Sequence, residues 1–303
     1  MLPHVAAIRY VTPLREGGSL PGLMEADDLG TYVVKFRGAG QGRKALIAEI
    51  VSARLARACG LAVPDLVTVD LDPALAPGEP DQEVQDLLRA SAGLNLGIDY
   101  LPGALDFDAG AGEVDGGLAG RVMWFDALVS NADRSWRNPN MLLWHGKLYL
   151  IDHGATLTFH HRWETAASAV ARPYDASDHA LAGRGARIDD ADRELSAALT
   201  EDLLRAAAVD IPEEWLADEP GFDRPDQVRE AYVSQLAGRL RARQAWLPGL
   251  RAAAAGGTPR DRGAGARPGR PAWLTGPRDH SGAGPQDHSG AGPQDHSGAG
   301  PQP

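Results

Sequence analysis

The chain has a single cysteine, Cys59, among its 303 residues. One cysteine cannot form an internal disulfide, which excludes a small disulfide-stabilised fold and is typical of a reducing compartment. No apolar run approaches the roughly 18 residues of a membrane span, and the N-terminus lacks the basic, apolar and small-residue blocks of a signal peptide. We therefore expect a cytoplasmic protein that no membrane anchors, with Cys59 as a small core residue.

Basic residues are also in deficit, because 30 Lys and Arg residues stand against 41 Asp and Glu residues, for a formal net charge of −11. No basic stripe with interleaved aromatics is present, which argues against nucleic acid as a direct partner. A polybasic segment of the kind that an anionic membrane surface attracts is missing as well. With 43% hydrophobic and 23% charged residues, the chain can bury a core of ordinary size.

The C-terminal residues 254–303 lack apolar periodicity. From about Gly256, Arg, Gly, Ala and Pro dominate, and the octapeptide Asp-His-Ser-Gly-Ala-Gly-Pro-Gln occurs three times in tandem from Asp279 to Gln302. Such a composition cannot bury enough apolar surface to offset the entropy of ordering, so this tail is predicted to be disordered. The one histidine per repeat could bind a metal weakly, but a neutral expansion of the repeat is the favoured interpretation.

The most informative stretch runs from Phe125 to Leu157. Within it, Met141–Trp144 and Leu148–Ile151 are apolar runs separated by three residues, which predicts two antiparallel strands and a tight turn. If the last residue of the first run pairs with the first residue of the second, Asn140 lies opposite Asp152. Directly opposed residues are about 4.5 to 5.5 Å apart at the backbone. One amide oxygen and one carboxylate could therefore share a divalent ion such as Mg²⁺.

A lone carboxylate, Asp133, precedes this hairpin in a polar loop. Phosphoryl transfer needs such a carboxylate for a hydroxyl proton, beside a metal that holds the phosphates. Each element also has a structural interpretation, since Asn-Pro-Asn and Asp-His-Gly are common turns and Asp133 could cap the exit of a helix at Val122–Leu128. Their occurrence in order on one hairpin favours the functional interpretation.

The series Asn131-Ala-Asp133-Arg134, then Asn140-Met-Leu-Leu, then Ile-Asp152-His-Gly resembles the HipA-like serine/threonine kinases. It is also similar to phosphatidylinositol 4-kinases, distant relatives on the same fold. The resemblance implies that Asp133 is the catalytic base with Arg134 beside it, and that Asn140 and Asp152 hold metal where protein kinases use the Asp of Asp-Phe-Gly. The usual family spacing, about five residues after the catalytic Asp, would instead select Asn138, which stays open as the alternative.

Upstream, Thr31–Phe36 is predicted to be a strand that places Lys35 on the face opposite Tyr32, Val34 and Phe36. Arg43–Cys59 is predicted to be a helix that ends at Gly60. Glu49 lies on a small-residue face of that helix, where a carboxylate needs a cation. A lysine on a strand is often just a solvated edge residue. The Val-Val-Lys-Phe pattern nevertheless resembles the kinase lysine strand, and a Lys35–Glu49 pair would orient the α- and β-phosphates.

A glycine-rich segment precedes this strand and offers Gly17, Gly18, Ser19 and Gly22 as candidates for binding phosphate through backbone N–H groups. No Gly-Lys-Ser/Thr follows, so it is not a Walker A loop, and an ordinary loop is an equally good interpretation. The family resemblance implies that Ser19 is a site of autophosphorylation.

Between the two halves, Asn95–Ala104 reads as a strand and an extended connector. The resemblance makes Tyr100 and Leu101 candidates for holding the adenine ring. Asp72–Asp86 is acidic, rich in Pro and Ala, and predicted to be an exposed insertion or loop of the N-lobe. Further on, the stretches at Ala191–Ala208 and Pro225–Trp246 are predicted helices of the core. His160-His161 and Asp178-His179 lack the spacing of a zinc site, so these histidines are expected to be packing or surface residues.

The resemblance implies an α+β, bilobal, protein-kinase-like fold. The expected divisions are a β-rich N-lobe over 1–104, a mainly helical C-lobe over 105–253 and the tail over 254–303. It implies ATP and Mg²⁺ as cofactors and transfer of the γ-phosphate to a serine or threonine hydroxyl, on a protein substrate. The alternatives are a phosphatidylinositol-4-kinase-like lipid or small-molecule kinase, a nucleotide-binding pseudokinase and a metal-dependent phosphohydrolase.

Overall fold

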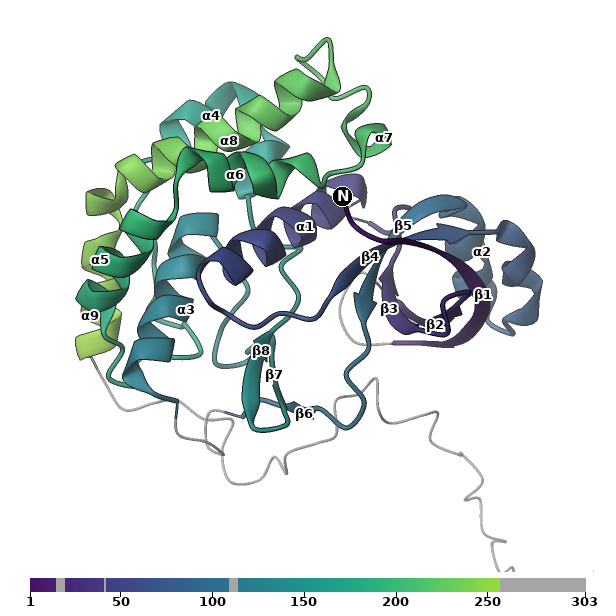
Figure 1. Ribbon diagram of the computed structural model, residues 1–303, viewed down its shortest axis with the longest axis horizontal. Coiled ribbons are helices and arrows are strands. Elements are labelled where there is room, and N and C mark those ends of the chain that lie inside the picture. The colour runs from purple at the N-terminus through teal and green to yellow at the C-terminus, as the bar shows by residue number, and fades with distance from the viewer. Residues whose placement is uncertain (15–19, 41, 109–113, 257–303) are drawn as a thin grey trace, which may run out of the picture.

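The computed structural model describes residues 1–14, 20–40, 42–108 and 114–256. Figure 1 shows a strand-rich first part that forms a β-barrel, and a second part made mostly of helices. A short sheet, β6 to β8, lies between them. The chain therefore has the α+β architecture that the sequence predicts. None of the described helices is long and apolar enough to cross a membrane.

Five strands close into the barrel in the spatial order β1-β2-β3-β5-β4. Neighbours are antiparallel except β1 and β4, which run parallel. Apolar side chains from alternate strand positions fill the interior. The strands are β1 (His4–Pro13), β2 (Gly22–Ala26), β3 (Thr31–Lys35), β4 (Leu66–Leu71) and β5 (Gly93–Asp99).

Strand β3 sorts its side chains as predicted. Val34 and, just beyond the strand, Phe36 belong to the barrel core and are 0% and 2% exposed. Lys35 contacts groups outside the barrel. Gly22 opens β2 inside the barrel, where an added Cβ would lie 2.5 Å from the ring of Tyr10. The glycine at this position is therefore explained by packing.

The segment from Asp72 to Asp86 is mostly exposed, as the sequence predicts, but it is helical and not a loop. It forms the 3₁₀ helix η1 (Pro73–Gly78) and most of α2 (Gln82–Ala90), and an aspartate side chain caps each helix at its start. Val84 and Leu88, one helical turn apart, are buried against the barrel. Only a few apolar residues anchor these helices. The acidic, Pro-rich sequence therefore shows no apolar periodicity from which they could be predicted.

Helix α1 (Gly42–Ala58) matches the predicted helix and connects the two parts of the molecule. Gly60, two residues after its end, has φ of +72°, and the N–H of Leu61 bonds to the carbonyl of Ala56, as in a Schellman motif. Ten of its residues are buried. The apolar ones share a core with the helices of the second part, so α1 is held by that part although it lies between the barrel strands β3 and β4 in the sequence.

The hairpin consists of β7 (Met141–Trp144) and β8 (Lys147–Leu150), with β6 (Leu105–Asp106) on the other side of β7. Its turn has two residues, His145 and Gly146, with φ of +47° and +73°. Both residues are left-handed, as in the type I′ turns that match the twist of antiparallel strands.

This turn shifts the register by one residue from the predicted one. Trp144 pairs with Lys147, and the N–H of Ile151 bonds to the carbonyl of Asn140 at 3.0 Å. The prediction that Asn140 lies directly opposite Asp152 is therefore wrong, because it assumed a three-residue turn. Asp152 follows one residue beyond the position opposite Asn140.

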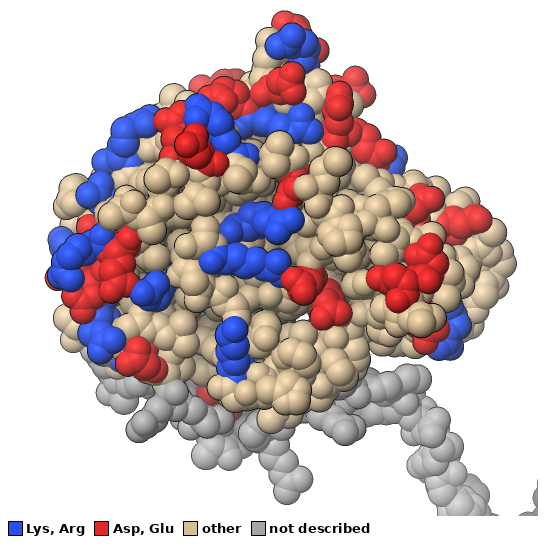
Figure 2. Space-filling model, in the orientation of Figure 1, with Lys and Arg blue, Asp and Glu red and all other residues tan. Residues whose placement is uncertain are grey.

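Helices make up most of the second part, and their surface carries basic side chains intermixed with acidic ones (Figure 2). The stretch Ala191–Ala208 is not one helix, because the chain breaks after Ala198 and Thr200 caps a new helix through the N–H of Leu203. Helix α9 ends at Ala255, two residues past the predicted boundary of the C-lobe. The elements are α3 (Gly116–Val129), η2 (Thr158–His161), α4 (Trp163–Ala169), α5 (Ile188–Ala198), α6 (Glu201–Val209), α7 (Glu213–Leu216), α8 (Pro225–Arg241), η3 (Arg243–Ala245) and α9 (Leu247–Ala255).

Candidate active site

Lys35 at the end of β3 forms an ion pair with Glu49 of α1, and the ammonium donates a hydrogen bond to Oε1. The two residues are 9% and 2% exposed. Burial disfavours both charges, but their mutual attraction outweighs it. The pKa of the Lys35 ammonium is therefore raised and the pKa of the Glu49 carboxyl is lowered from their ordinary values. The structure thus contains the pair that the sequence predicts.

The same ammonium also bonds to Asp152, with 2.6 Å between Nζ and Oδ1. Asp152 directly follows the hairpin and its side chain is 47% exposed, so it lies on the solvent side of the Lys35–Glu49 pair. Its φ is +55°, a left-handed conformation that carries a cost for a residue with a side chain. Lys35 therefore joins the α1 carboxylate to the carboxylate that the sequence assigns to metal.

His153 extends this cluster behind Glu49. It is 2% exposed, its Nδ1 lies 3.6 Å from Oε2 of Glu49, and its ring meets the edge of Phe125 with centroids 5.9 Å apart. Glu49 is thus held by a lysine on one oxygen and approached by a histidine on the other. The sequence placed His153 in an Asp-His-Gly turn, and nothing in that turn revealed its contact with a helix a hundred residues away.

The candidate base, Asp133, is half-buried in the loop between α3 and β7. Its backbone N–H bonds to Oδ1 of Asn131 at 3.0 Å, which fixes the start of the loop. Its Oδ2 accepts the side-chain amides of both Asn138 and Asn140, each at 3.0 Å. Within the described part of the chain, Oδ1 accepts no hydrogen bond. One carboxylate oxygen is therefore anchored while the other can accept a proton.

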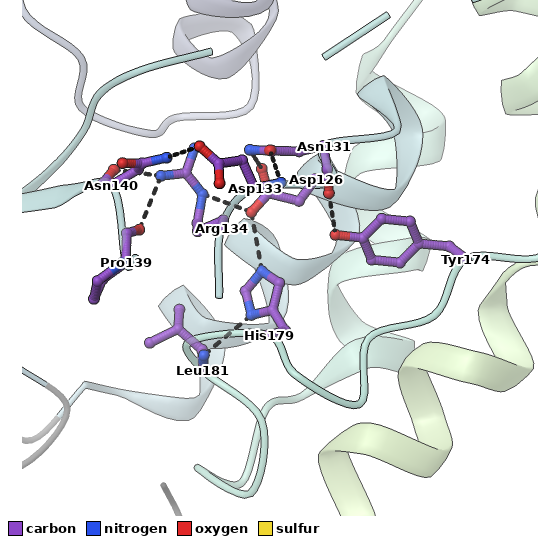
Figure 3. Close-up of polar contacts among 9 residues, drawn as sticks. All are labelled: Asp126, Asn131, Asp133, Arg134, Pro139, Asn140, Tyr174, His179 and Leu181. Atoms are coloured by element: carbon purple, nitrogen blue, oxygen red, sulfur yellow. Dashed lines mark hydrogen bonds and ion pairs between the residues drawn. The ribbon is translucent and has the colours of Figure 1, made fainter. Parts of the chain in front are cut away.

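A buried network of hydrogen bonds supports the loop that carries Asp133 (Figure 3). Asp126 of α3 accepts hydrogen bonds from Nε of Arg134 at 2.7 Å, from Nε2 of His179 at 3.0 Å and from the amide of Asn131 at 2.8 Å. The guanidinium of Arg134 also donates to the carbonyl of Asn140. Arg134, predicted beside the catalytic base, is 2% exposed and links the two ends of the loop.

The tautomer of His179 follows from its two contacts. Its Nδ1 accepts the backbone N–H of Leu181 at 3.0 Å, so Nε2 carries the hydrogen that Asp126 accepts. Burial alone would raise the pKa of the Asp126 carboxyl, but Arg134 and His179 outweigh it and lower that pKa to about 2. Asp126 is therefore a fixed negative charge.

Sequence reasoning did not find this network. It treated His179 as a packing residue, and the residue is indeed buried, but its bond to Asp126 was not foreseen. One signal was present: Asp126 stands inside the apolar run Val122–Val129, where an unpartnered charge would be costly. A carboxylate at that position had to have buried cationic or N–H partners.

The residues available to a metal are oxygen donors. The described part of the chain has no cluster of three or more His, Cys, Asp or Glu side chains that could hold an ion. Mg²⁺ does not need one, since it is bound by one or two protein oxygens with phosphate and water. Because the amide nitrogens of Asn138 and Asn140 face Asp133, their Oδ1 atoms remain as acceptors. Together with Asp152, these donors fit Mg²⁺.

Asn140 differs from Asn138 in its surroundings. It is 9% exposed, it has φ of +48°, and its carbonyl bonds to the residue just before Asp152. Asn138 is exposed in the loop. The two asparagines share Asp133, but only Asn140 is held at the hairpin from which Asp152 emerges.

A cavity of about 130 Å³ lies beside Lys35, between the barrel and the hairpin. Of the two residues predicted to hold the adenine ring, Leu101 lines this cavity and Tyr100 does not; the backbone N–H of Tyr100 bonds to the carbonyl of Thr31 at 3.0 Å. Gly17, Gly18 and Ser19 lie outside the described residues, and Gly22 faces the barrel core. The lining residues are Leu14, Pro21, Val33, Lys35, Pro64, Ile98, Asp99, Leu101, Leu142, Ile151 and Asp152.

Asp99 is the polar lining residue that sequence reasoning missed. Burial, with the nearby charges of Asp65 and Asp28, raises the pKa of its carboxyl. It stands at the end of β5, opposite Tyr32 in the neighbouring strand. A carboxyl group at this position could accept hydrogen bonds from a ligand in an otherwise mainly apolar cavity.

A barrel with a buried lysine, a helix that supplies its carboxylate, and a polar loop followed by a hairpin and a second carboxylate define a protein-kinase-like fold. A family model described as HipA-like kinase matches residues 8–247. The chain therefore belongs to the HipA-like kinase family and is a phosphotransferase. A search of curated proteins finds no match.

Solved structures with the same fold include the Helicobacter pylori proinflammatory kinase CtkA. It is 10% identical, with a TM-score of 0.50, and the match covers 82% of this chain and 98% of that chain. The Golgi casein kinase with Mn/ADP bound is 11% identical, with a TM-score of 0.38 over 80% of this chain and 74% of that chain. The likeness to CtkA extends the fold assignment over most of the described residues.

Proposed function

We propose that this kinase transfers the γ-phosphate of ATP, with Mg²⁺, to a serine or threonine hydroxyl of a protein. The observation that carries the proposal is the double contact of Lys35 with Glu49 and Asp152. It brings the residues that kinases use for the α- and β-phosphates and for the metal into one cluster. The adjacent cavity of about 130 Å³, with its mainly apolar lining, suits the base of a nucleotide.

In this proposal each side chain has a distinct task. Lys35 binds the phosphates, and Glu49 keeps the ammonium charged and oriented. Asp133 presents its free Oδ1 to the acceptor hydroxyl and takes the proton as the oxygen attacks phosphorus. Arg134 and Asp126 are buried and fix the loop that carries Asp133, so they are positioning residues. Bound Mg²⁺ would neutralise phosphate charge, held by Asp152 and by Asn140 or Asn138.

The acceptor class rests on the family and not on a recognised pocket. Lipid and small-molecule acceptors, and loss of activity as in a pseudokinase, remain outcomes of the experiment. The pure protein is incubated with Mg²⁺ and ATP labelled on the γ-phosphate, alone and with cell lysate. Label on protein, recovered as phosphoserine or phosphothreonine, supports the proposal. Label in lipid, release of free phosphate alone, or no transfer would contradict it.

Asp133→Asn is the matched control for this assay. The new amide oxygen can still accept the hydrogen bonds from Asn138 and Asn140, so the loop should be preserved while the base is lost. We expect phosphate transfer to fall by roughly 10² or more, the scale of a general base, with ATP binding changed by no more than about a few-fold. Full transfer by this variant would remove Asp133 from the mechanism.

A further inference from the structure

A second, larger cavity of about 480 Å³ opens on the helical part, beside the catalytic loop. Its walls come from that loop, from the segment after the hairpin and from α8. Ala132 and Ser135, on either side of the Asp133–Arg134 pair, are among its lining residues. The lining residues are Ser130, Asn131, Ala132, Arg134, Ser135, Thr158, Phe159, Ala169, Arg172, Pro173, Tyr174, Asp175, Asp178, His179, Gln235 and Arg239.

Asp133 itself does not line this cavity, so the cavity is a neighbouring subsite and not the place of the reacting hydroxyl. The Asp133 carboxylate turns toward Asn140, whereas Tyr174 and His179, which line the cavity, bond to Asn131 and Asp126 (Figure 3). An extended peptide advances about 3.3 to 3.6 Å per residue. A peptide whose hydroxyl reaches Asp133 would therefore place a side chain within a few residues of that hydroxyl at the cavity.

The cavity holds two guanidinium groups that no carboxylate balances. Arg239 of α8 is 4% exposed and bonds only to backbone carbonyls, including those of Ala127 and Arg172 at 2.8 and 3.1 Å. Arg172 is exposed at the rim. Among the described residues, neither forms an ion pair. Burial and the nearby charge of Arg172 lower the pKa of Arg239 to about 10.

The other charges in the lining do not cancel this pair. Arg134 is neutralised by Asp126, with 2.7 Å between Nε and Oδ2. Asp178 lies 3.6 Å from Arg137 outside the cavity. Asp175 remains, and it accepts the N–H of Ser177 at 2.9 Å. The lining thus has two guanidinium groups without a carboxylate partner among the described residues and one carboxylate, Asp175, without a cation, in a chain whose net charge is −11.

Paired arginines are the rule elsewhere on this surface. Figure 2 shows basic side chains beside acidic ones over the helices, and ion pairs such as Arg54–Asp210 and Arg57–Asp65, with nitrogen–oxygen distances of 2.5 and 2.6 Å, are typical. A buried arginine without a carboxylate is costly, because its charge is taken out of water without a counter-charge. A carboxylate supplied by a ligand would relieve that cost.

We propose that this cavity binds an acidic side chain of the peptide that accepts phosphate, with Arg172 and Arg239 as its ligands. The inference rests on the proposed protein-kinase function and gives it a substrate class: serine or threonine residues with Asp or Glu a few positions away. Arg172 at the rim meets the carboxylate first, and Arg239 at the base receives it in a desolvated place, where charge-assisted bonds are strongest.

Direct binding tests the inference without any need for catalysis. Two fluorescent peptides are compared by anisotropy, one with a serine flanked by aspartates and its twin flanked by asparagines. The full chain should bind the aspartate peptide at least about fivefold more tightly at low salt, the scale of one charge-assisted contact at an accessible site. Salt should weaken this preference.

Arg172 is the residue to change, because Arg239 holds several backbone carbonyls and its loss could unfold the chain. Arg172→Ala should remove most of the preference, and Arg172→Glu should shift it toward a lysine-flanked serine peptide. Arg241→Ala is the matched control: Arg241 is exposed at the end of α8, the helix that carries Arg239, but does not line the cavity, and this variant should keep the full preference. Thermal melts should be alike for the three variants.

Equal binding of the twin peptides, or an unchanged preference in both Arg172 variants, would overturn the inference. Vesicles with a phosphorylated inositol lipid that bind more tightly than the aspartate peptide, and compete with it, would assign the cavity to a headgroup and overturn it too. A preference for the aspartate peptide without phosphate transfer to it would leave the acidic-ligand site standing and refute the proposed transfer to a protein hydroxyl. Equal binding of both peptides, with phosphate transfer to both at equal rates, would support the proposed kinase function and refute the inference.

Discussion

The ammonium of Lys35 lies 2.6 Å from Oδ1 of Asp152, although the two residues are 117 positions apart in the sequence. This contact connects the barrel to the segment that follows the hairpin. Because Glu49 bonds to the same ammonium, one cation is shared by two carboxylates, the buried Glu49 and the half-exposed Asp152. The charge of Lys35 therefore bears on the stability of the fold as well as on nucleotide binding.

Lys35→Met should lower both the activity with ATP and the stability of the fold. The phosphates lose their cation, so we expect kcat/KM for ATP to fall by roughly 10² to 10³, the range seen when one preorganised electrostatic donor is removed. Glu49 is left buried without its main partner, which costs about 3 to 5 kcal/mol in the free energy of unfolding. Steady-state kinetics and urea unfolding measure the two losses separately.

A double variant separates stability from catalysis. Adding Glu49→Gln to Lys35→Met removes the stranded charge, so most of the lost free energy of unfolding should return while activity stays low. Glu49→Gln alone should leave the fold near its normal stability and reduce activity, because the ammonium is no longer oriented. A double variant that remains as unstable as Lys35→Met would show that the pair does not act as a unit.

Asp126 gives a prediction with a defined pH window. Its folded pKa, about 2, lies below the ordinary value of 3.8, so its contribution is fully present above about pH 4 and is lost as the pH falls through about 2. The difference corresponds to about 2 kcal/mol of unfolding free energy. Asp126→Asn should thus be destabilised at pH 7, and the gap to the unmodified protein should narrow between about pH 4 and 2.

Urea unfolding at several pH values measures this gap. Asp202→Asn is the control, because the Asp202 side chain is 95% exposed, and its gap should stay near zero at every pH. The Asp126 variant leaves Arg134 buried without its carboxylate, so the loss at pH 7 should exceed the titration component alone. An Asp126 variant as stable as the unmodified protein at pH 7 would contradict the supporting role of the network.

The C-terminal residues provide a third prediction. A chain ended after Gly256 should keep its melting temperature and its kinase activity, because the removed sequence has no apolar periodicity with which to dock. A chain ended after Trp246 is the contrast, since it loses α9, whose Leu247 and Leu250 are fully buried. That second truncation should lower the melting temperature clearly. A drop of many degrees in the first would show that the tail docks on the folded part.

Much of the fold could be predicted because local patterns and packing agree. The β-branched residues around Lys35 make a strand, and the Ala- and Leu-rich run with Gly60 after it makes α1. The Lys35–Glu49 pair could be inferred because a charge on a packed helix face requires a partner. This inference needed only the order of two neighbouring elements and no long-range geometry.

The hairpin register could not be predicted, because it depends on backbone conformation in two residues. His145 adopts the left-handed φ that glycine favours and shortens the turn, and this moves every pair by one position. The contacts of His153 with Glu49 and of His179 with Asp126 bridge 104 and 53 positions in the sequence. No periodic pattern encodes contacts of that range.

The choice between Asn138 and Asn140 leads to the last prediction. The register argument for Asn140 failed in detail, but Asn140 is buried, left-handed and bonded to the residue that precedes Asp152. We therefore expect Asn140 and Asp152 to serve the same ion. Asp152→Asn should raise the Mg²⁺ concentration needed for nucleotide binding most strongly, because it removes the negative charge that attracts the ion. Asn140→Ala should raise it less, by roughly tenfold.

Asn138→Ala is the matched control, since it also removes one of the two amides on Oδ2 of Asp133. If the effect of Asn140→Ala came only from a loosened Asp133, the two alanine variants would change phosphate transfer alike and leave the Mg²⁺ requirement alone. A metal role for Asn140 requires a shift in the Mg²⁺ titration that Asn138→Ala lacks. A large rise in the Mg²⁺ requirement of Asn138→Ala, with no change in Asn140→Ala, would instead support the five-residue family spacing. The ion would then be held by Asn138, in the exposed part of the loop.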